Sequence, residues 1–256
     1  MKFLKIKLFV SIVTIGGFLG CREQPLHLSE IAVSQVSIDS TLRPDDSLEA
    51  FIRPYRDHVT ATLNEPLAYA PTTLSKTDGQ RNTSIGNLMA DMLLARTDTL
   101  LALQGRPPAD LAVLNHGGIR SLISPGPVSR STAYEIMPFE NSIQVVAMQG
   151  KSIRDLVAFL IASDRPHPFS GMRIQLDSRG SLASVDIAGS PFDENRVYQV
   201  ATSSYLVQGG DDMGFFAGAD SVYETGYSIR NALIDFFIQV DTLRATVDDR
   251  FIEARK

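Results

Sequence analysis

The sequence predicts an α+β domain in which helices and strands pack in mixed layers. Apolar residues recur at intervals of three and four at 84–93 and 152–162, which is typical of helices with one buried face. Short apolar or alternating runs between bounding Gly, Pro and Asp residues predict strands. The two kinds of element do not alternate in a regular rhythm, so we expect a layered α+β fold rather than a doubly wound parallel sheet.

Capping residues and breakers position these elements. A helix is expected to begin at 45–47, where two acids favour a first turn, and Pro54 should interrupt or kink it. Thr83 or Ser84 should cap a second helix. The remaining expectations are strands at 66–71, 110–114, 142–148, 173–177, 182–187 and 197–201, a turn at Gly180, and helices at 152–162 and 228–240.

The composition is that of an ordinary globular protein, with 44% hydrophobic and 21% charged residues. With 24 basic and 29 acidic residues the net charge is −5, which argues against a nucleic-acid binder but allows a local basic pocket. A single cysteine, Cys21, excludes an intrachain disulfide and a cysteine-rich zinc module. We expect no metal site and no cofactor in this chain, because the four histidines are far apart: His27, His58, His116 and His167.

The first 21 residues predict an export signal. Residues 1–7 carry three lysines and no acid, and residues 8–19 are apolar but too short for a comfortable membrane span. Phe-Leu-Gly-Cys at 18–21 resembles a bacterial lipobox, in which Cys21 becomes the acylated first residue. The alternatives are an ordinary cleaved signal peptide or a short membrane anchor. We therefore expect residues 1–21 to be a lipoprotein signal peptide, and the protein to be lipid-anchored in the cell envelope, facing the periplasm or the exterior.

Residues 22–44 predict a tether, because prolines and scattered Ser and Asp residues are typical of a spacer. Within it, only residues 31–38 alternate apolar and polar side chains, which could form an edge strand. The body of the protein is then expected to be one domain at 45–256.

Two clusters contain residue types that suit an anionic ligand. Arg81 stands just before a predicted helix start, where unpaired N–H groups and the helix dipole favour an anion. A plain cap with a solvated arginine is the alternative. After the strand at 110–114 comes Asn-His-Gly-Gly-Ile-Arg, whose glycines allow close backbone approach and whose arginine suits phosphate or carboxylate. A simple turn is the alternative there, and the candidate residues are Asn115, Gly117, Gly118 and Arg120.

Two further clusters pair an aromatic ring with a polar group. Phe139 and Asn141 lie in a proline-containing turn, and Tyr205 and Asp211 flank a Gly-Gly pair. A core Phe and a surface Asp in a hairpin are the simpler interpretations. Taken together, two rings that stack on a heterocycle, each contributing about 1–3 kcal/mol, with an amide, a carboxylate and arginines, suit a nucleotide or nucleoside.

The same residues carry a family resemblance. The ordered motifs R-x-x-x-x-G-N-L, N-x-G-G-I-R, P-F-x-N and Y-L-x-x-G-G-D resemble the C-terminal domain of 5′-nucleotidases, and the UDP-sugar hydrolase/5′-nucleotidase group is the nearest form. The resemblance covers about residues 45–240 and implies a mixed α/β substrate-binding module. It implies a ring sandwich by Phe139 and Tyr205, a ribose contact by Asp211, a base contact by Asn141, and ribose and phosphate contacts by Arg81, Asn115 and Arg120.

The chain also departs from the family pattern. His116 stands where the family often has a small residue, so it could crowd the pocket or add a pH-sensitive contact. Tyr205 replaces a ring that is often Phe, and stacking should survive this change. The metallophosphatase motifs of the family, D-x-H, G-N-H-[DE] and G-H-x-H, do not occur in the sequence. The resemblance therefore implies no catalytic residue in this chain.

These observations leave three functional hypotheses. In the first, the chain is the nucleotide-binding part of a split 5′-nucleotidase, a phosphoric monoester hydrolase of nucleotide breakdown. A separate metallophosphatase chain would then carry the divalent metals. In the second, it is a stand-alone nucleotide- or nucleoside-binding lipoprotein without a catalytic role. In the third, it keeps the fold but has lost the ligand.

Overall fold

The computed structural model describes residue 10, residue 28 and residues 31–254. The chain divides into two compact units, Met1–Phe51 and Ile52–Lys256, and the division falls inside helix α2 (Asp46–Asn64). Cys21 and the rest of the expected signal peptide, apart from Val10, lie outside the described residues. The boundaries expected for the signal peptide, the tether and the domain stay predictions.

The expected edge strand at 31–38 is wrong. These residues, all described, form no strand, and the side chains of Val33 and Ile38 are 86% and 93% exposed. Alternation specifies a strand when one face is buried against a partner. No such burial occurs here, so the pattern alone was misleading.

Helix α2 begins where the acids predicted it. One Asp45 side-chain oxygen accepts hydrogen bonds from the backbone N–H groups of Ser47 at 2.9 Å and Leu48 at 3.1 Å. Pro54 lies inside α2 without ending it. A proline removes one helical hydrogen bond, and because α2 has no buried residue, water can solvate the carbonyl left without a partner.

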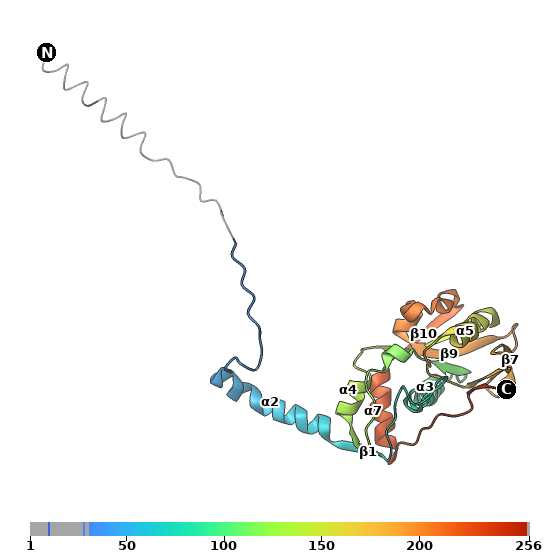
Figure 1. Ribbon diagram of the computed structural model, residues 1–256, viewed down its shortest axis with the longest axis horizontal. Helices are drawn as coiled ribbons and strands as arrows, with labels where there is room; N and C mark the ends of the chain where they lie inside the picture. The colour runs from blue at the N-terminus through green and yellow to red at the C-terminus, as the bar shows by residue number, and fades with distance from the viewer. Residues whose placement is uncertain (1–9, 11–27, 29–30, 255–256) are drawn as a thin grey trace. The chain divides into compact units, whose positions relative to one another are not determined.

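The second unit is built around a five-stranded mixed sheet in the order β10-β4-β9-β2-β5 (Figure 1). Strand β9 pairs parallel with β2 and antiparallel with β4, and the two outer pairings are antiparallel. The strands are β2 (Leu111–Val113), β4 (Ser142–Gln149), β5 (Phe169–Ser170), β9 (Val197–Ser203) and β10 (Ser221–Ser228).

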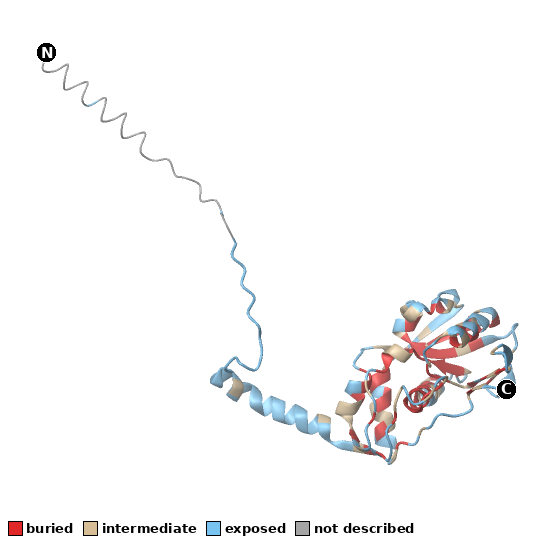
Figure 2. Cartoon of the chain, viewed as in Figure 1, coloured by how far each residue is buried: buried red, intermediate tan, exposed pale blue. Residues whose placement is uncertain are grey.

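Both faces of this sheet are covered, which gives two hydrophobic cores. Along β2, Leu111 and Val113 join one core, and the intervening Ala112 joins the other, as expected for a strand whose side chains alternate between faces. Figure 2 shows the buried residues gathered in the sheet and on the helix faces that pack against it. The first core includes α5 (Gly150–Ala162), and the second includes α3 (Ser84–Leu103) and α7 (Ile229–Gln239).

A second sheet, in the order β11-β6-β7-β8, closes the first core. Gly180, with φ of +80°, makes the turn between β6 and β7, as predicted. A separate pair, β1 and β3, is antiparallel. The remaining elements are β1 (Pro66–Ala70), β3 (Gly126–Ser129), β6 (Met172–Leu176), β7 (Leu182–Ile187), β8 (Ser190–Pro191), β11 (Phe251–Glu253), α4 (Arg130–Ile136), α6 (Ser204–Val207), η1 (His116–Gly118), η2 (Gly210–Asp212) and η3 (Gly214–Gly218).

The layered α+β prediction is confirmed, and so are the helices expected near residues 84, 152 and 228. Thr83 is the cap of α3, where its side chain accepts from the N–H of Gly86 at 3.2 Å. The sequence analysis missed α4 and β10. Helix α4 has seven residues, too few to show a period, and β10 is an edge strand with no fully buried position.

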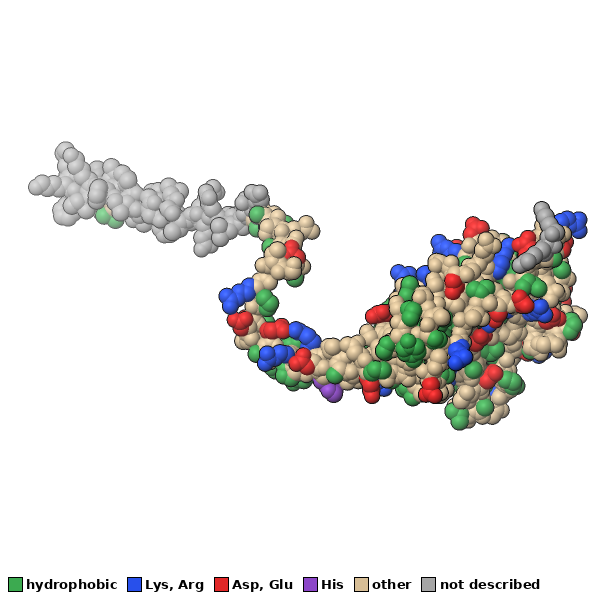
Figure 3. Space-filling view, turned by 60° about the horizontal axis from the view of Figure 1, so that its bottom comes forward, with side chains coloured by type: hydrophobic (Ala, Val, Ile, Leu, Met, Phe, Trp, Pro, Cys, Tyr) green, Lys and Arg blue, Asp and Glu red, His purple; other side chains and the backbone are tan. Residues whose placement is uncertain are grey.

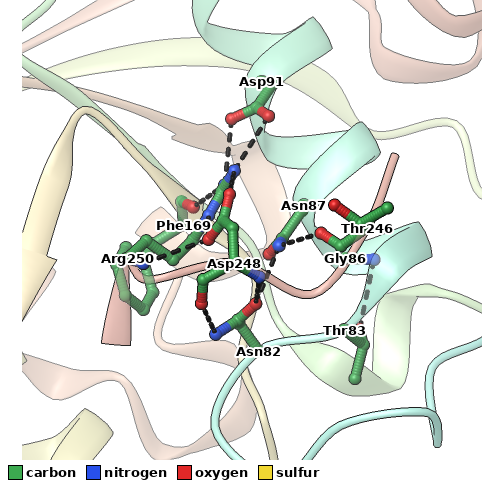
Figure 4. Close-up of polar contacts among 9 residues, drawn as sticks. All are labelled: Asn82, Thr83, Gly86, Asn87, Asp91, Phe169, Thr246, Asp248 and Arg250. Carbon is green, nitrogen blue, oxygen red and sulfur yellow. Dashed lines mark hydrogen bonds and ion pairs between the residues drawn. The ribbon is translucent and has the colours of Figure 1, made fainter. Parts of the chain in front are cut away.

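Two asparagines hold the segment that leads to β11 (Figure 4). The Asn82 side chain donates to the carbonyl of Asp248 at 2.9 Å and accepts from the N–H of the same residue at 3.0 Å. Asn87 donates to Asn82 and to the carbonyl of Thr246, each at 2.8 Å. Both asparagines are buried, so these contacts fix chain segments more than 150 residues apart.

Arg250 forms the second half of this attachment. Its guanidinium makes two bonds of 2.9 Å to the carboxylate of Asp91 on α3 and further bonds to Asp248 and to the carbonyl of Phe169 (Figure 4). Two-pronged arginine–carboxylate pairs are among the stronger polar contacts in proteins. The segment that leads to β11 is therefore joined to the first half of α3.

Asn82→Ala is expected to lower the free energy of unfolding by about 2 kcal/mol, because the backbone of Asp248 and the side-chain amide of the buried Asn87 lose their partner. Urea unfolding followed by circular dichroism measures this change. Asn231→Ala, at an exposed position of α7, should change it by less than about 0.5 kcal/mol. Equal losses in the two variants would contradict the structural role of Asn82.

Candidate functional site

Three of the four predicted clusters lie at one edge of the central sheet. Strands β2 and β9 are parallel, so the loops that follow them leave at the same edge. Strand β4 is antiparallel to β9, with Ile143 opposite Ser203, so the loop that precedes β4 also lies there. In mixed and parallel sheets this is where ligand crevices commonly form.

Asp211 is the centre of this edge. One of its carboxylate oxygens accepts from the Asn115 side-chain amide at 2.7 Å, and the other accepts from the Tyr205 hydroxyl at 3.0 Å. The hydrogen bond to Asp211 raises the pKa of Tyr205, so this hydroxyl stays a donor. Gly117 faces the same carboxylate: a β-carbon there would lie 3.3 Å from an Asp211 oxygen. We call Asn115, Gly117, Tyr205 and Asp211 the Asp211 cluster.

Two more glycines are required by close approaches in these loops. A β-carbon on Gly118 would lie 2.8 Å from the side-chain oxygen of Asn115, and one on Gly210 would lie 2.4 Å from the Tyr205 ring. Contacts this short essentially never occur for real β-carbons. Both positions therefore need glycine for the Asp211 cluster to assemble.

Two aromatic rings are exposed beside this cluster. Phe139, in the loop before β4, is 41% exposed, and Tyr205, on α6, is 43% exposed. The Arg120 guanidinium lies 5.8 Å from the centre of the Phe139 ring and donates to the carbonyl of Gly117 at 3.3 Å. Arg120 thus links Phe139 to the Asp211 cluster. Asn141 lies two residues from Phe139, and its carbonyl accepts from the N–H of Ile229 at 3.0 Å.

The structure places Arg81 outside the Asp211 cluster. It donates to the carbonyl of Ile161 at 3.0 Å, lies 5.1 Å from the centre of the Phe251 ring, and is 3.9 Å from the Glu253 carboxylate. Arg81 lines a cavity of about 470 Å³ whose wall also includes His116. It therefore approaches the predicted loops from a different side than Asp211.

The start of α3 is a plain helix cap. Its backbone N–H groups are already bonded: Ser84 donates to the Asp78 carboxylate at 3.0 Å, and Gly86 donates to Thr83. An anion would have to compete with Asp78 for these donors. The helix start is thus a plain cap, but Arg81 is not the solvated arginine of the simpler interpretation, because it contacts Ile161 and Phe251. Its role in ligand binding stays a prediction.

Sequence reasoning missed His167. This buried imidazole accepts through Nδ1 from the N–H of His116 at 3.3 Å, and so fixes the turn that carries Asn115 and Gly117 of the Asp211 cluster. Burial lowers the pKa of His167 to about 4, so the ring is neutral near pH 7 and its proton sits on Nε2. A lone histidine between two prolines has no spacing that could have predicted this contact.

His116 is half-buried on the other side of the same turn. Its Nε2 lies 3.3 Å from the carbonyl of Lys76, and the Lys76 ammonium donates to the carbonyl of Ile119 at 2.7 Å. Burial lowers the pKa of His116, with smaller contributions from nearby cations. Lys76 was also not predicted as a site residue, since nothing in its neighbourhood repeats or forms a motif.

Within 31–254 and the two isolated described positions, no group of three or more His, Cys, Asp or Glu side chains is arranged to hold a metal ion. Among the same residues, no helix has the length and apolar character needed to cross a bilayer.

Comparison with known families identifies the class. The family model for the C-terminal domain of 5′-nucleotidase matches residues 59–218, which is more than half of the chain. This protein therefore belongs to the 5′-nucleotidase C-terminal domain family, as the four motifs predicted.

Individual relatives agree with this membership. The chain is 27% identical over 212 residues to a 5′-nucleotidase of Vibrio vulnificus, covering 79% of this chain and 36% of that protein. It is 31% identical over 134 residues to protein UshA of Escherichia coli, covering 50% and 24% of the two chains. The match thus spans well under half the length of these relatives.

Solved structures share the fold. A 5′-nucleotidase precursor from Thermus thermophilus superposes with a TM-score of 0.67 at 24% identity, covering 83% of this chain and 44% of that one. The NAD nucleotidase of Haemophilus influenzae superposes with a TM-score of 0.60 at 18% identity, covering 82% and 42%.

The buried His167 should make stability depend on pH. Its pKa of about 4 is below the value of 6.5 expected in the unfolded chain, so the unfolded state binds the proton more readily between these values. Stability should therefore fall as the pH drops from 7 to 4.5, with His167 contributing about 2 kcal/mol of the loss. Urea unfolding of the parent and of His167→Gln at both pH values isolates this contribution.

In that comparison the carboxylates titrate in both proteins and largely cancel in the difference. The glutamine side chain of the variant offers an oxygen that can still accept from the N–H of His116. The same pH dependence in parent and variant would show that His167 is not the titrating group.

Proposed function

We propose that this chain is the nucleotide-binding part of a split 5′-nucleotidase, whose hydrolysis requires a separate metallophosphatase chain. The observation that carries the proposal is the Asp211 cluster: a carboxylate held at the sheet edge by Asn115 and Tyr205, with two exposed rings beside it. Membership of the 5′-nucleotidase C-terminal domain family supports a nucleotide as the ligand.

Asp211 is suited to bind the two hydroxyls of a ribose. An ionised carboxylate offers about four acceptor positions, and Asn115 and Tyr205 occupy one on each oxygen. Each oxygen therefore retains room for a hydroxyl donor. Because two side chains already orient the carboxylate, little freedom is lost when the ligand binds.

The rings are suited to hold the base. In the proposal, Phe139 and Tyr205 stack on its two faces, and Asn141 meets its polar edge. The Arg120 guanidinium now lies over the Phe139 ring, where it is held by a weak contact to Gly117. A base that stacks on the Phe139 ring would displace Arg120 from it. The freed guanidinium could then contact the ribose and phosphate, so binding of the base would also help to bind the other end of the ligand.

The contribution to catalysis would be orientation. Holding the nucleotide in a fixed position lowers the entropic barrier of the reaction, while divalent metals on the partner supply the attacking water. Support for the division of labour comes from the sequence, which contains none of the metallophosphatase motifs in its 256 residues. The proposed reaction is phosphate release from nucleotides in extracytoplasmic nucleotide breakdown.

An activity assay of this chain mixed with a metallophosphatase tests this proposal. A candidate partner metallophosphatase, assayed with Mn²⁺ and AMP, should release phosphate at least tenfold faster when the chain is added. Asp211→Asn should lose most of this gain, because the ribose acceptor is weakened. The chain alone should release no phosphate with Mn²⁺ or Zn²⁺.

Three outcomes separate the alternatives. No gain over the partner alone, together with tight AMP binding by this chain, would favour a stand-alone binding lipoprotein. Absence of any nucleotide binding would support the third hypothesis, in which the chain keeps the fold but has lost the ligand. Metal-dependent turnover by the pure chain would refute the split enzyme.

We also propose that Cys21 is acylated and anchors the protein in the cell envelope. The support is the basic, apolar and Leu-Gly-Cys pattern of the first 21 residues. Labelling with radioactive palmitate should mark the expressed protein, and Cys21→Ser should abolish the label. Equal labelling of both proteins would exclude this site.

A further inference from the structure

The cavity of about 470 Å³ beside the Asp211 cluster has a wall rich in cations. Lys76 comes from the segment before α3, His116 from η1, and Arg165 from the segment after α5, so three distant parts of the chain meet there. We propose that this cavity, which we call the cation cavity, binds the phosphate end of the nucleotide through Lys76 and Arg165. This deepens the proposed function and depends on it for the identity of the ligand.

The charges in the cavity favour an anion. Its wall contains three permanent cations, Lys76, Arg81 and Arg165, and two carboxylates, Asp164 and Glu253. Glu253 lies 3.9 Å from Arg81, so these two charges partly balance one another. Lys76 and Arg165 remain against the single charge of Asp164, which leaves a positive excess in a chain whose net charge is −5.

Both cations retain donors for a ligand. An ammonium group has three N–H donors, and Lys76 uses one of them, toward the carbonyl of Ile119. The Arg165 guanidinium makes no hydrogen bond or ion pair with any residue that the structure describes, although its backbone is fixed by Ser163. An arginine and a lysine that line one cavity and keep free donors suit the oxygens of a phosphate.

His116 places the cavity next to the Asp211 cluster. Its side chain lines the cavity, and the next residue, Gly117, faces Asp211. Burial lowers the pKa of His116; Lys76 and Arg165 add to this lowering, and Asp211 opposes it.

The two sites are reached from neighbouring residues of one turn. His116 lines the cavity and Gly117 faces Asp211, and the α-carbons of neighbouring residues are about 3.8 Å apart. In a nucleotide the phosphate follows the ribose after a single carbon and oxygen. A cavity of about 470 Å³ lies within the range usual for ligand pockets, about 300–1,000 Å³, so it has room for more than one phosphate.

Calorimetry of the full chain with adenosine, AMP and pyrophosphate tests the inference. AMP should bind at least tenfold more tightly than adenosine, and pyrophosphate should bind without any nucleoside. The double variant Lys76→Gln with Arg165→Gln should bind AMP about tenfold more weakly and lose pyrophosphate. Its adenosine affinity should match that of the parent, which also shows that the variant is folded.

Matched variants separate this effect from a general loss of charge and from the nucleoside site. Lys151→Gln with Arg179→Gln removes the same two charges at exposed positions outside the cavity and should change none of the three affinities. Phe139→Ala should weaken adenosine and AMP by the same factor and leave pyrophosphate unchanged. A Phe139→Ala variant that lost pyrophosphate would overturn the separation of the two sites.

The two proposals fail in different ways. Equal affinities of the parent for AMP and adenosine, or pyrophosphate binding that survives in the cavity variant, would overturn the cation cavity while the nucleoside site stands. Pyrophosphate binding that depends on Lys76 and Arg165, in a protein that binds no adenosine, would support the cavity and refute the proposed nucleotidase role. Figure 3 shows one face of the molecule, on which basic and acidic side chains are interspersed.

Discussion

The parallel pairing of β2 with β9 is the constraint on which the site depends. The ladder itself joins only Leu111 to Val200 and Ala112 to Ala201. A buried contact prolongs it, because the Thr202 hydroxyl donates to the carbonyl of Val113 at 2.8 Å. Since both strands run in the same direction, their following loops leave together, and residues 96 positions apart in the sequence meet as Asn115 and Asp211.

The backbone at Asp211 shows how much the site constrains its own loop. Asp211 and Asp212 have φ of 52° and 59°, the left-handed region that side chains other than glycine rarely adopt. Aspartate tolerates this conformation better than most residues, and its cost is offset where several contacts fix the side chain. Tyr205 and Asn115 provide those contacts.

The sequence predicted the parts of this protein that repeat a local pattern. Helices α3, α5 and α7 have long apolar periods, and the Asp211 loop follows a recognisable motif. Residues 31–38 repeat the pattern of a strand without a partner, and the prediction was wrong because pairing is not a local property. Arg81 and His167 show the same limit in the site. Arg81 lies over the Phe251 ring, and His167 accepts a hydrogen bond from His116. Only the tertiary fold brings these residues together.

The turn at 116–117 explains why two adjacent positions carry such different residues. Position 117 faces the Asp211 carboxylate so closely that a β-carbon would crowd an oxygen at 3.3 Å, so glycine is favoured there. Position 116 faces the cavity wall, which has room for an imidazole and two longer cations. The backbone between them thus separates a negative surface from a positive one. A ligand with hydroxyls at one end and phosphate at the other matches this order of charges, and a ligand of uniform charge would be repelled at one of the two sides.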